Sequence, residues 1–241
     1  MATIQRPEEI FSALTEDYKK LYQNDLISII LYGSGAGQDY KPGKSDLNFL
    51  IVLSENAVDQ LDRALDTVAR WRKKNVAIPL IMTRSYIDTS LDAFPLEFLT
   101  MKNSYRVVYG DDVLGEISFD MNHVRLQCER EIKGKLLLLR EGFMGTQGKQ
   151  KRIQELIAAS ITAFTAIFHG LLYMKGTEIP TTKREIIEKC SENIPIRSDV
   201  FMTCLDIKEG KKVYPSNIKD FFTDYLAEVG RLWKFVDTME V

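Results

Sequence analysis

The sequence predicts an α+β protein, with a small mixed β-sheet domain followed by an all-α helical bundle. In the first half, short apolar runs rich in β-branched residues alternate with helical patterns. The composition changes after about Gly115, and from His123 onward hydrophobic residues recur almost only at helical spacing. We therefore expect two domains, residues 1–115 and 116–241.

The first predicted elements are one helix and two apolar strands. Pro7 and the acidic residues after it suit the first turn of a helix, which we expect over Pro7–Asn24. Leu26–Tyr32 is almost continuously apolar and contains three isoleucines, which predicts a strand covered on both faces. A glycine-rich polar loop then leads to a second apolar strand, Phe49–Leu53.

The rest of the first half is predicted to complete a small sheet. The expected elements, in order, are a helix, a strand, a short helix and two short strands: Glu55–Lys74, Val76–Met82, Ser85–Ala93, Leu96–Met101 and Tyr105–Tyr109. Pro79 lies inside the first of these strands, which predicts an edge position or a bulge there.

The second half predicts four or five helices packed as a bundle. The expected helices are Val124–Phe143, Arg152–Lys175, Thr182–Cys190, Asp199–Ile207 and Ser216–Met239. The second is the most apolar, so we expect it at the centre of the bundle. Thr182 and Glu185 have the spacing of a capping box at the start of the third.

The composition indicates an ordinary soluble protein. Of the 241 residues, 45% are hydrophobic and 27% charged, and the net charge of −2 gives no global field for nucleic acid or an anionic membrane. The N-terminus lacks the features of a signal peptide, and we expect no apolar run to approach the ~20 residues that span a bilayer. Three widely spaced cysteines and two histidines do not form a disulfide or zinc pattern, so we expect buried cysteines and a cytoplasmic location.

The stretch from Leu31 to Leu53 carries the chemistry that the sequence predicts. Gly33 after the first strand lets the backbone approach a ligand closely, and the Ser34 hydroxyl with nearby N–H groups can hold a phosphate. Alternate residues of a strand face one side, so Asp46 and Asn48 are expected to point together and bind a metal ion. A plain tight turn at Gly33 and an ordinary turn cap at Asp46 are the structural alternatives.

These motifs resemble those of the polymerase-β-like nucleotidyltransferase superfamily. That superfamily has Gly-Ser, then Asp-apolar-Asp, which are similar to Gly33-Ser34 and Asp46-Leu47-Asn48. The antibiotic (aminoglycoside) nucleotidyltransferases are the most similar in appearance. They have a proline-containing loop like Lys41–Asp46, a Pro-Leu-Glu strand like Pro95–Leu99, and a Tyr-Gly-Asp stretch like Tyr109–Asp111. They also have a C-terminal helical bundle.

The resemblance implies a set of site residues. Gly33, Ser34, Lys44 and Ser45 would bind the phosphates of a nucleoside triphosphate. Asp46, Asn48 and Glu97 would hold Mg²⁺ or Mn²⁺, with Asp46 and Glu97 catalytic and Glu97 also a candidate general base. Glu97 on an edge strand could equally be a surface residue. The enzyme would move a nucleoside monophosphate to an acceptor hydroxyl.

Asn48 departs from the superfamily pattern, which has a carboxylate at this position. An amide oxygen can bind magnesium, but it attracts the ion less and cannot bridge two ions. Two alternatives to a magnesium-dependent enzyme therefore stay open. One is a nucleotide-binding or regulatory module with weakened chemistry, and the other is a partner-binding protein like the antitoxins of toxin–antitoxin pairs.

The partners are predicted only by class. We expect a nucleoside triphosphate and an acceptor that is a small molecule or a protein, with no membrane association. The charge disfavours nucleic acid, and a homodimer is left open.

Overall fold

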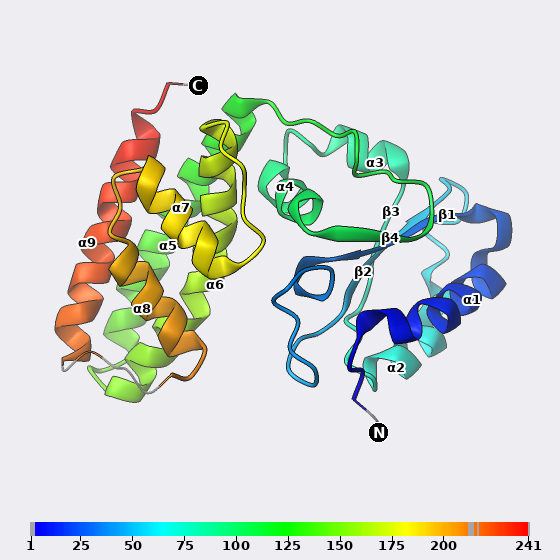
Figure 1. The fold of residues 1–241 in the computed structure, drawn as a ribbon, viewed down its shortest axis with the longest axis horizontal. Helices are drawn as coiled ribbons and strands as arrows, with labels where there is room; N and C mark the ends of the chain where they lie inside the picture. The colour runs from blue at the N-terminus through cyan, green and yellow to red at the C-terminus, as the bar shows by residue number, and fades with distance from the viewer. Residues whose placement is uncertain (1–2, 212–214, 216, 241) are drawn as a thin grey trace. The chain divides into compact units, whose positions relative to one another are not determined.

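A computed structural model describes residues 3–211, 215 and 217–240 of the chain. The chain packs as two compact units. The sheet unit comprises Met1–Asp92 and Phe98–Ser118, and the helical unit comprises Ala93–Glu97 and Phe119–Val241. The predicted α+β class, a small mixed sheet with a helical C-terminal region, is confirmed (Figure 1).

The sheet has four strands in the order β3-β2-β1-β4. The strands are β1 (Leu26–Tyr32), β2 (Asn48–Leu53), β3 (Leu80–Met82) and β4 (Tyr105–Gly110). Strand β1 pairs antiparallel with both β2 and β4, and β2 pairs parallel with β3. The two strands around the glycine-rich loop are therefore neighbours, as the sequence predicts.

The sheet buries one face against two helices, α1 (Phe11–Tyr22) and α2 (Leu65–Arg72), which lie on the same side in Figure 1. Alternate strand residues form this core with residues of the helices: Ile29, Leu31, Phe49, Ile51, Leu14, Tyr18, Tyr22 and Trp71. Ile30 and Leu50 point to the other face and are fully buried too. The continuous apolar run of β1 thus reflects burial on both faces, as expected.

Three predicted elements of the sheet unit are shorter in the structure. A short 3₁₀ turn, Leu61–Ala64, and α2 replace the long helix expected over Glu55–Lys74. The short helix α3 spans Arg84–Thr89. The strand expected over Val76–Met82 is reduced to β3, with an isolated bridge between Leu47 and Val76. Pro79 lies between these two pairings, where it interrupts the ladder as a bulge-forming proline would.

The strand predicted at Leu96–Met101 is wrong, because Pro95–Asn103 forms a helix, α4. Pro95 suits the first helical position, and leucine, methionine and glutamate are good helix formers. The consecutive burial of Phe98 and Leu99 is incompatible with a strand that has one solvent-facing side. The short helix is buried on several sides, so its buried residues do not alternate with exposed ones as they would along a half-buried strand.

The helical unit contains the five predicted helices. They are α5 (Met121–Gly145), α6 (Gln150–Met174), α7 (Lys183–Asn193), α8 (Ser198–Lys208) and α9 (Ile218–Asp237). Helix α6 is central and packs against the other four. Thr182 accepts a hydrogen bond from the Glu185 backbone N–H, which confirms the N-cap of the predicted capping box, and the Glu185 carboxylate accepts from the Thr182 hydroxyl at 2.7 Å. Residue 216, the expected start of the last helix, lies outside the described residues.

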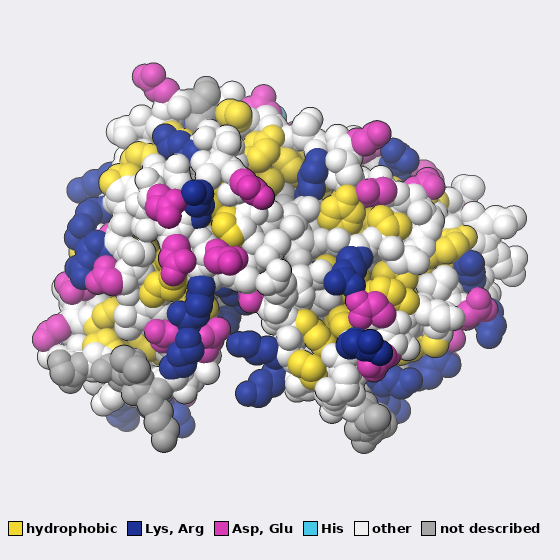
Figure 2. Space-filling view, in the orientation of Figure 1, with side chains coloured by type: hydrophobic (Ala, Val, Ile, Leu, Met, Phe, Trp, Pro, Cys, Tyr) yellow, Lys and Arg dark blue, Asp and Glu magenta, His cyan; other side chains and the backbone are white. Residues whose placement is uncertain are grey.

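Helix α6 is long and apolar enough to cross a membrane, contrary to the expectation that no segment is. Its apolar side chains include Phe164 and Phe168, which pack in an aromatic cluster with Phe201 and Tyr225 inside the bundle. Its hydrophobicity is therefore accounted for by its central place in the helical unit. All three cysteines are buried and free, as predicted. On the face shown in Figure 2, basic and acidic side chains are intermixed.

Candidate functional site

The predicted phosphate turn and the start of β2 lie side by side. Tyr32 at the end of β1 is paired directly with Asn48 at the start of β2. Gly33 follows with a φ of 72°, and a β-carbon there would be 3.8 Å from Asn48 Nδ2. A β-carbon on Gly35 would be only 2.8 Å from Leu47 Cδ2. The Gly33–Gly35 turn therefore packs directly onto Leu47 and Asn48.

Leu47 anchors the segment that carries Asp46 and Asn48. Its side chain is fully buried, its N–H donates to the Asn75 carbonyl at 2.9 Å, and its carbonyl accepts from the Ala77 N–H at 3.0 Å. Because side chains alternate along a strand, this burial turns Asp46 and Asn48 to the other face.

Asp46 is exposed and Asn48 half-buried. Among the described residues, neither the Asp46 carboxylate nor the Asn48 amide has a hydrogen-bond or ion-pair partner. Two adjacent oxygen donors without protein partners fit the first shell of Mg²⁺, which usually takes one or two protein groups and fills its other positions with water and phosphate oxygens.

The other predicted phosphate ligands divide into available and occupied groups. The Gly33 N–H donates to the Ser104 carbonyl at 2.9 Å, so Gly33 shapes the turn and its own N–H is occupied. The Ser45 hydroxyl accepts from the Lys41 N–H at 3.0 Å and braces the loop. Lys44 is exposed, and the half-buried Ser34 hydroxyl has no partner among the residues described. Ser34 is therefore the hydroxyl of this turn best placed for an anion.

Glu97 does not lie on a strand, so that part of its prediction is wrong. It stands in the first turn of α4, and its carboxylate accepts from Gln127 Nε2 at 2.7 Å. Gln127 Oε1 in turn accepts from the Leu96 N–H at 2.9 Å. Glu97 belongs to the helical unit, whereas Asp46 and Asn48 belong to the sheet unit. Its place beside them stays a prediction.

The strands next to the site supply no replacement for the missing carboxylate. Strands β3 and β4 contain no aspartate or glutamate. Within the described part of the chain, no three His, Cys, Asp or Glu side chains are grouped as a metal site. Strands β3 and β4 therefore add no carboxylate to Asp46 and Asn48.

A solved structure with a similar fold is found among the known proteins. It is the spectinomycin adenyltransferase AAD(9) from Enterococcus faecialis, crystallised with ATP and spectinomycin. The match covers 91% of this chain and 99% of that one, with a TM-score of 0.52 and 15% sequence identity. This chain has a nucleotidyltransferase fold.

At this level of identity the likeness concerns the fold alone. No protein-family model matches the sequence, and no curated protein matches it. The predicted resemblance to the antibiotic nucleotidyltransferases is thus confirmed for the fold, and membership of the superfamily stays a prediction.

The sheet places Tyr32 beside Asn48, and Tyr105 on the far side of Tyr32, two tyrosines that the sequence did not single out. Tyr32 is paired with Asn48 on one side and with Tyr105 on the other. Burial raises the pKa of Tyr32. Burial, followed by a 2.9 Å hydrogen bond to Asp112, raises the pKa of Tyr105 to about 12. Both phenols are therefore neutral near pH 7. Asn48, Tyr32 and Tyr105 thus form a row across three neighbouring strands, which only the strand register could have revealed.

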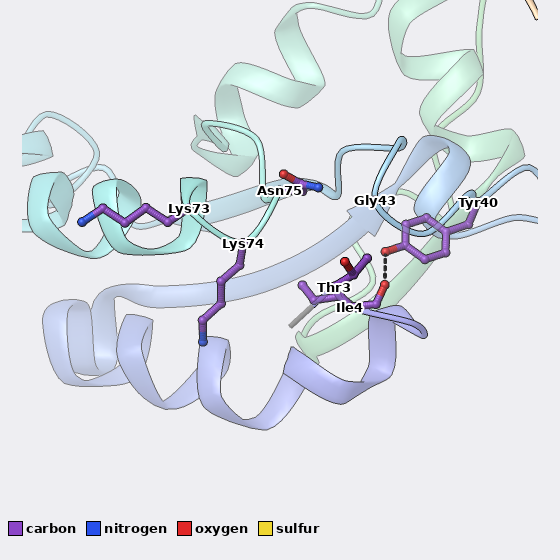
Figure 3. Close-up of a pocket in the computed structure, with 7 residues that line it drawn as sticks. All are labelled: Thr3, Ile4, Tyr40, Gly43, Lys73, Lys74 and Asn75. Atoms are coloured by element: carbon purple, nitrogen blue, oxygen red, sulfur yellow. Dashed lines mark hydrogen bonds between the residues drawn. The ribbon is translucent and has the colours of Figure 1, made fainter. Parts of the chain in front are cut away.

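A separate hollow of about 120 Å³ lies beside the same loop (Figure 3). Seven residues line it, and Tyr40 donates a 2.9 Å hydrogen bond to the Ile4 carbonyl there. Figure 3 shows the side chains of Lys73 and Lys74 directed away from Tyr40. None of the predicted site residues lines this hollow, so it is distinct from the end of the sheet that carries Asp46 and Asn48.

Proposed function

We propose that this protein binds a nucleoside triphosphate at the end of the sheet formed by Gly33, Ser34, Asp46 and Asn48, and transfers its nucleoside monophosphate to an acceptor hydroxyl. The observation that carries the proposal is the pair of unpartnered oxygen donors, Asp46 and Asn48, packed against a glycine turn on a nucleotidyltransferase fold. The similar solved structure contains ATP, so ATP is the first nucleotide to test.

Each residue has a defined part in this proposal. The Asp46 carboxylate and Asn48 Oδ1 would hold Mg²⁺ or Mn²⁺, which supplies positive charge to the phosphate oxygens when bound. The Ser34 hydroxyl would donate to a phosphate oxygen, with Lys44 and Ser45 on the adjoining loop.

The transfer itself forms one bond and breaks one. The acceptor oxygen attacks the α-phosphorus, the bond from that phosphorus to the bridging oxygen breaks, and pyrophosphate leaves. The acceptor proton passes to a general base, and Glu97 is the residue that the resemblance proposes for it. The acceptor would be a small molecule or a protein, the two classes that the sequence leaves open.

A second function is favoured by one specific observation. Asn48 lacks the charge of a carboxylate, and neither β3 nor β4 supplies another. A site with one carboxylate attracts a divalent ion less strongly than a site with two or three. A module that binds nucleotide and signals its presence, without transfer, is therefore the alternative.

Labelled nucleoside triphosphates with Mg²⁺, Mn²⁺ or a chelator separate these functions. Transfer to a mixture of candidate acceptors that disappears in Asp46→Ala supports the enzyme, and binding without turnover, with turnover restored by Asn48→Asp, supports the module. Asp59→Ala is the matched control, because Asp59 is an exposed aspartate elsewhere in the sheet unit. If no triphosphate binds under any metal condition, both functions are refuted.

Glu97→Gln tests the proposed general base separately. The glutamine carbonyl can still accept the hydrogen bond from Gln127, so the first turn of α4 should keep its contact while the basic carboxylate is lost. We expect transfer to be abolished with thermal stability retained. A fully active variant would remove Glu97 from the site.

A further inference from the structure

Ser104 holds the Gly33–Ser34 turn from a position just before strand β4. It lies between the end of α4 and the start of β4, and β4 begins beside the last residue of β1. Its carbonyl accepts the Gly33 N–H at 2.9 Å, and its hydroxyl donates to the Gly33 carbonyl at 3.2 Å. One residue therefore binds both polar groups of Gly33.

The same hydroxyl also contacts the far end of the turn. A β-carbon on Gly37 would be 2.8 Å from Ser104 Oγ, so the two residues are in direct contact. The Gly33 carbonyl additionally accepts the Ala36 N–H at 2.9 Å. The turn is thus closed on itself and attached to Ser104, the residue just before β4, through both the carbonyl and the hydroxyl of that serine.

These bonds determine which way the Gly33–Ser34 peptide faces. A trans peptide is planar, and its C=O and N–H point in opposite directions. Holding the Gly33 carbonyl toward Ser104 and Ala36 therefore aims the Ser34 N–H away from them. If this peptide flipped, its carbonyl dipole would replace the N–H and would repel an anion. Gly33 adopts a φ of 72°, a conformation in which glycine has no steric penalty.

We propose that Ser104 is a positioning residue for the nucleotide site, which keeps the Ser34 N–H and hydroxyl oriented toward the phosphates of a nucleoside triphosphate. This inference rests on the function proposed above. Ser104 itself donates to the protein backbone and acts through Gly33. The sequence offers no motif for it, because it lies some 70 residues after the turn that it holds.

Ser28 provides a matched control within the same pair of strands. Its hydroxyl also donates to backbone carbonyls, those of Tyr109 and Asp111, and it is fully buried. It lies four residues before Tyr32 on β1, roughly 13 Å from the site end of the strand. Ser28→Ala should therefore lower stability without changing the turn, whereas Ser104→Ala should loosen the turn.

The binding experiment compares ATP affinity in Mg²⁺ for the wild type, Ser104→Ala, Ser104→Thr and Ser28→Ala. Loss of one neutral hydrogen bond predicts a roughly 2- to 12-fold weaker affinity in Ser104→Ala. Ser104→Thr keeps the hydroxyl and should bind as the wild type does, and so should Ser28→Ala. Unchanged affinity in Ser104→Ala, or an equal loss in Ser28→Ala, would overturn the proposal.

Hydrogen exchange of backbone amides in the 33–37 turn gives a readout that needs no nucleotide. Exchange there should be faster in Ser104→Ala than in the wild type and unchanged in Ser28→Ala. Equal exchange in Ser104→Ala and the wild type would refute the positioning role even if the protein binds ATP. If the wild type binds no triphosphate with any metal, the proposed function fails, and the exchange data still decide whether Ser104 holds the turn.

Discussion

Asn48→Asp tests whether positions 46 and 48 share one cation-binding face. Two residues along a strand are roughly 7 Å apart. Two unit charges at that distance repel by about 0.6 kcal/mol in a fully aqueous dielectric and by about 2.4 kcal/mol at an effective dielectric constant of about 20. Because Asp46 is exposed and Asn48 half-buried, we expect a loss of about 1 kcal/mol in unfolding free energy when no metal is present.

Thermal unfolding in chelator and in Mg²⁺ measures this effect. A loss of about 1 kcal/mol lowers the melting temperature by roughly 2–4 °C for a chain of this size. A divalent ion that binds between the two carboxylates removes the repulsion and adds binding free energy. In chelator, Asn48→Asp should therefore have a lower melting temperature than the wild type. Mg²⁺ should raise the melting temperature of Asn48→Asp more than that of the wild type.

The double variant Asp46→Asn/Asn48→Asp is the control, because it keeps the wild-type charge while exchanging the two positions. It should melt near the wild type in chelator, since only one carboxylate remains. The prediction is refuted if Asn48→Asp has the melting temperature of the wild type in chelator and if Mg²⁺ raises both melting temperatures equally. The two side chains then do not share a face that binds cations.

Three further predictions concern stability. Glu228→Ala removes the buried carboxylate that accepts the Arg197 N–H at 3.1 Å, so chemical denaturation should show a loss of about 1–3 kcal/mol, and a loss below about 0.5 kcal/mol would contradict this. Gly110→Ala would put a β-carbon 1.9 Å from a β1 carbonyl at a φ of 77°, so it should abolish the soluble fold. Gly210→Ala has a φ of 72° in open space and should cost only about 1–2 kcal/mol; equal losses in the two variants would refute the clash. Burial lowers the pKa of His169 from 6.5 to about 4, so the unfolded chain binds more protons between these values and stability should fall by up to about 3 kcal/mol as the pH drops from 6.5 to 4. In His169→Gln that part of the pH dependence should disappear, and an unchanged profile would show that other groups cause it.

The sequence predicted well where the signal is local. The apolar runs of β1 and β2 are strands because β-branched residues suit a pleated surface, and the amphipathic patterns of the second half are helices because their apolar faces need a common core. Gly33 could be placed in a turn because its backbone conformation favours glycine.

The sequence failed at Pro95–Asn103 for a physical reason. The segment is short and apolar on most sides, so neither a period of two nor one of 3.6 residues is distinct. Its helical state follows from packing on several sides and from the hydrogen bonds of the Gln127 side chain with the Leu96 N–H and the Glu97 carboxylate. These contacts join residues 30 or 31 positions apart, which no local pattern records.

By itself, the sequence determined that Gly33-Ser34 and Asp46-Leu47-Asn48 flank a loop between two strands, and that position 48 carries an amide instead of a charge. Only the tertiary structure decided what surrounds them: Tyr32 and Tyr105 in a row with Asn48, Ser104 on the turn, and no carboxylate on β3 or β4. Hydrogen-bonded strand register brings these neighbours together across long stretches of chain, whereas a turn and an alternating strand are set by the residues within them.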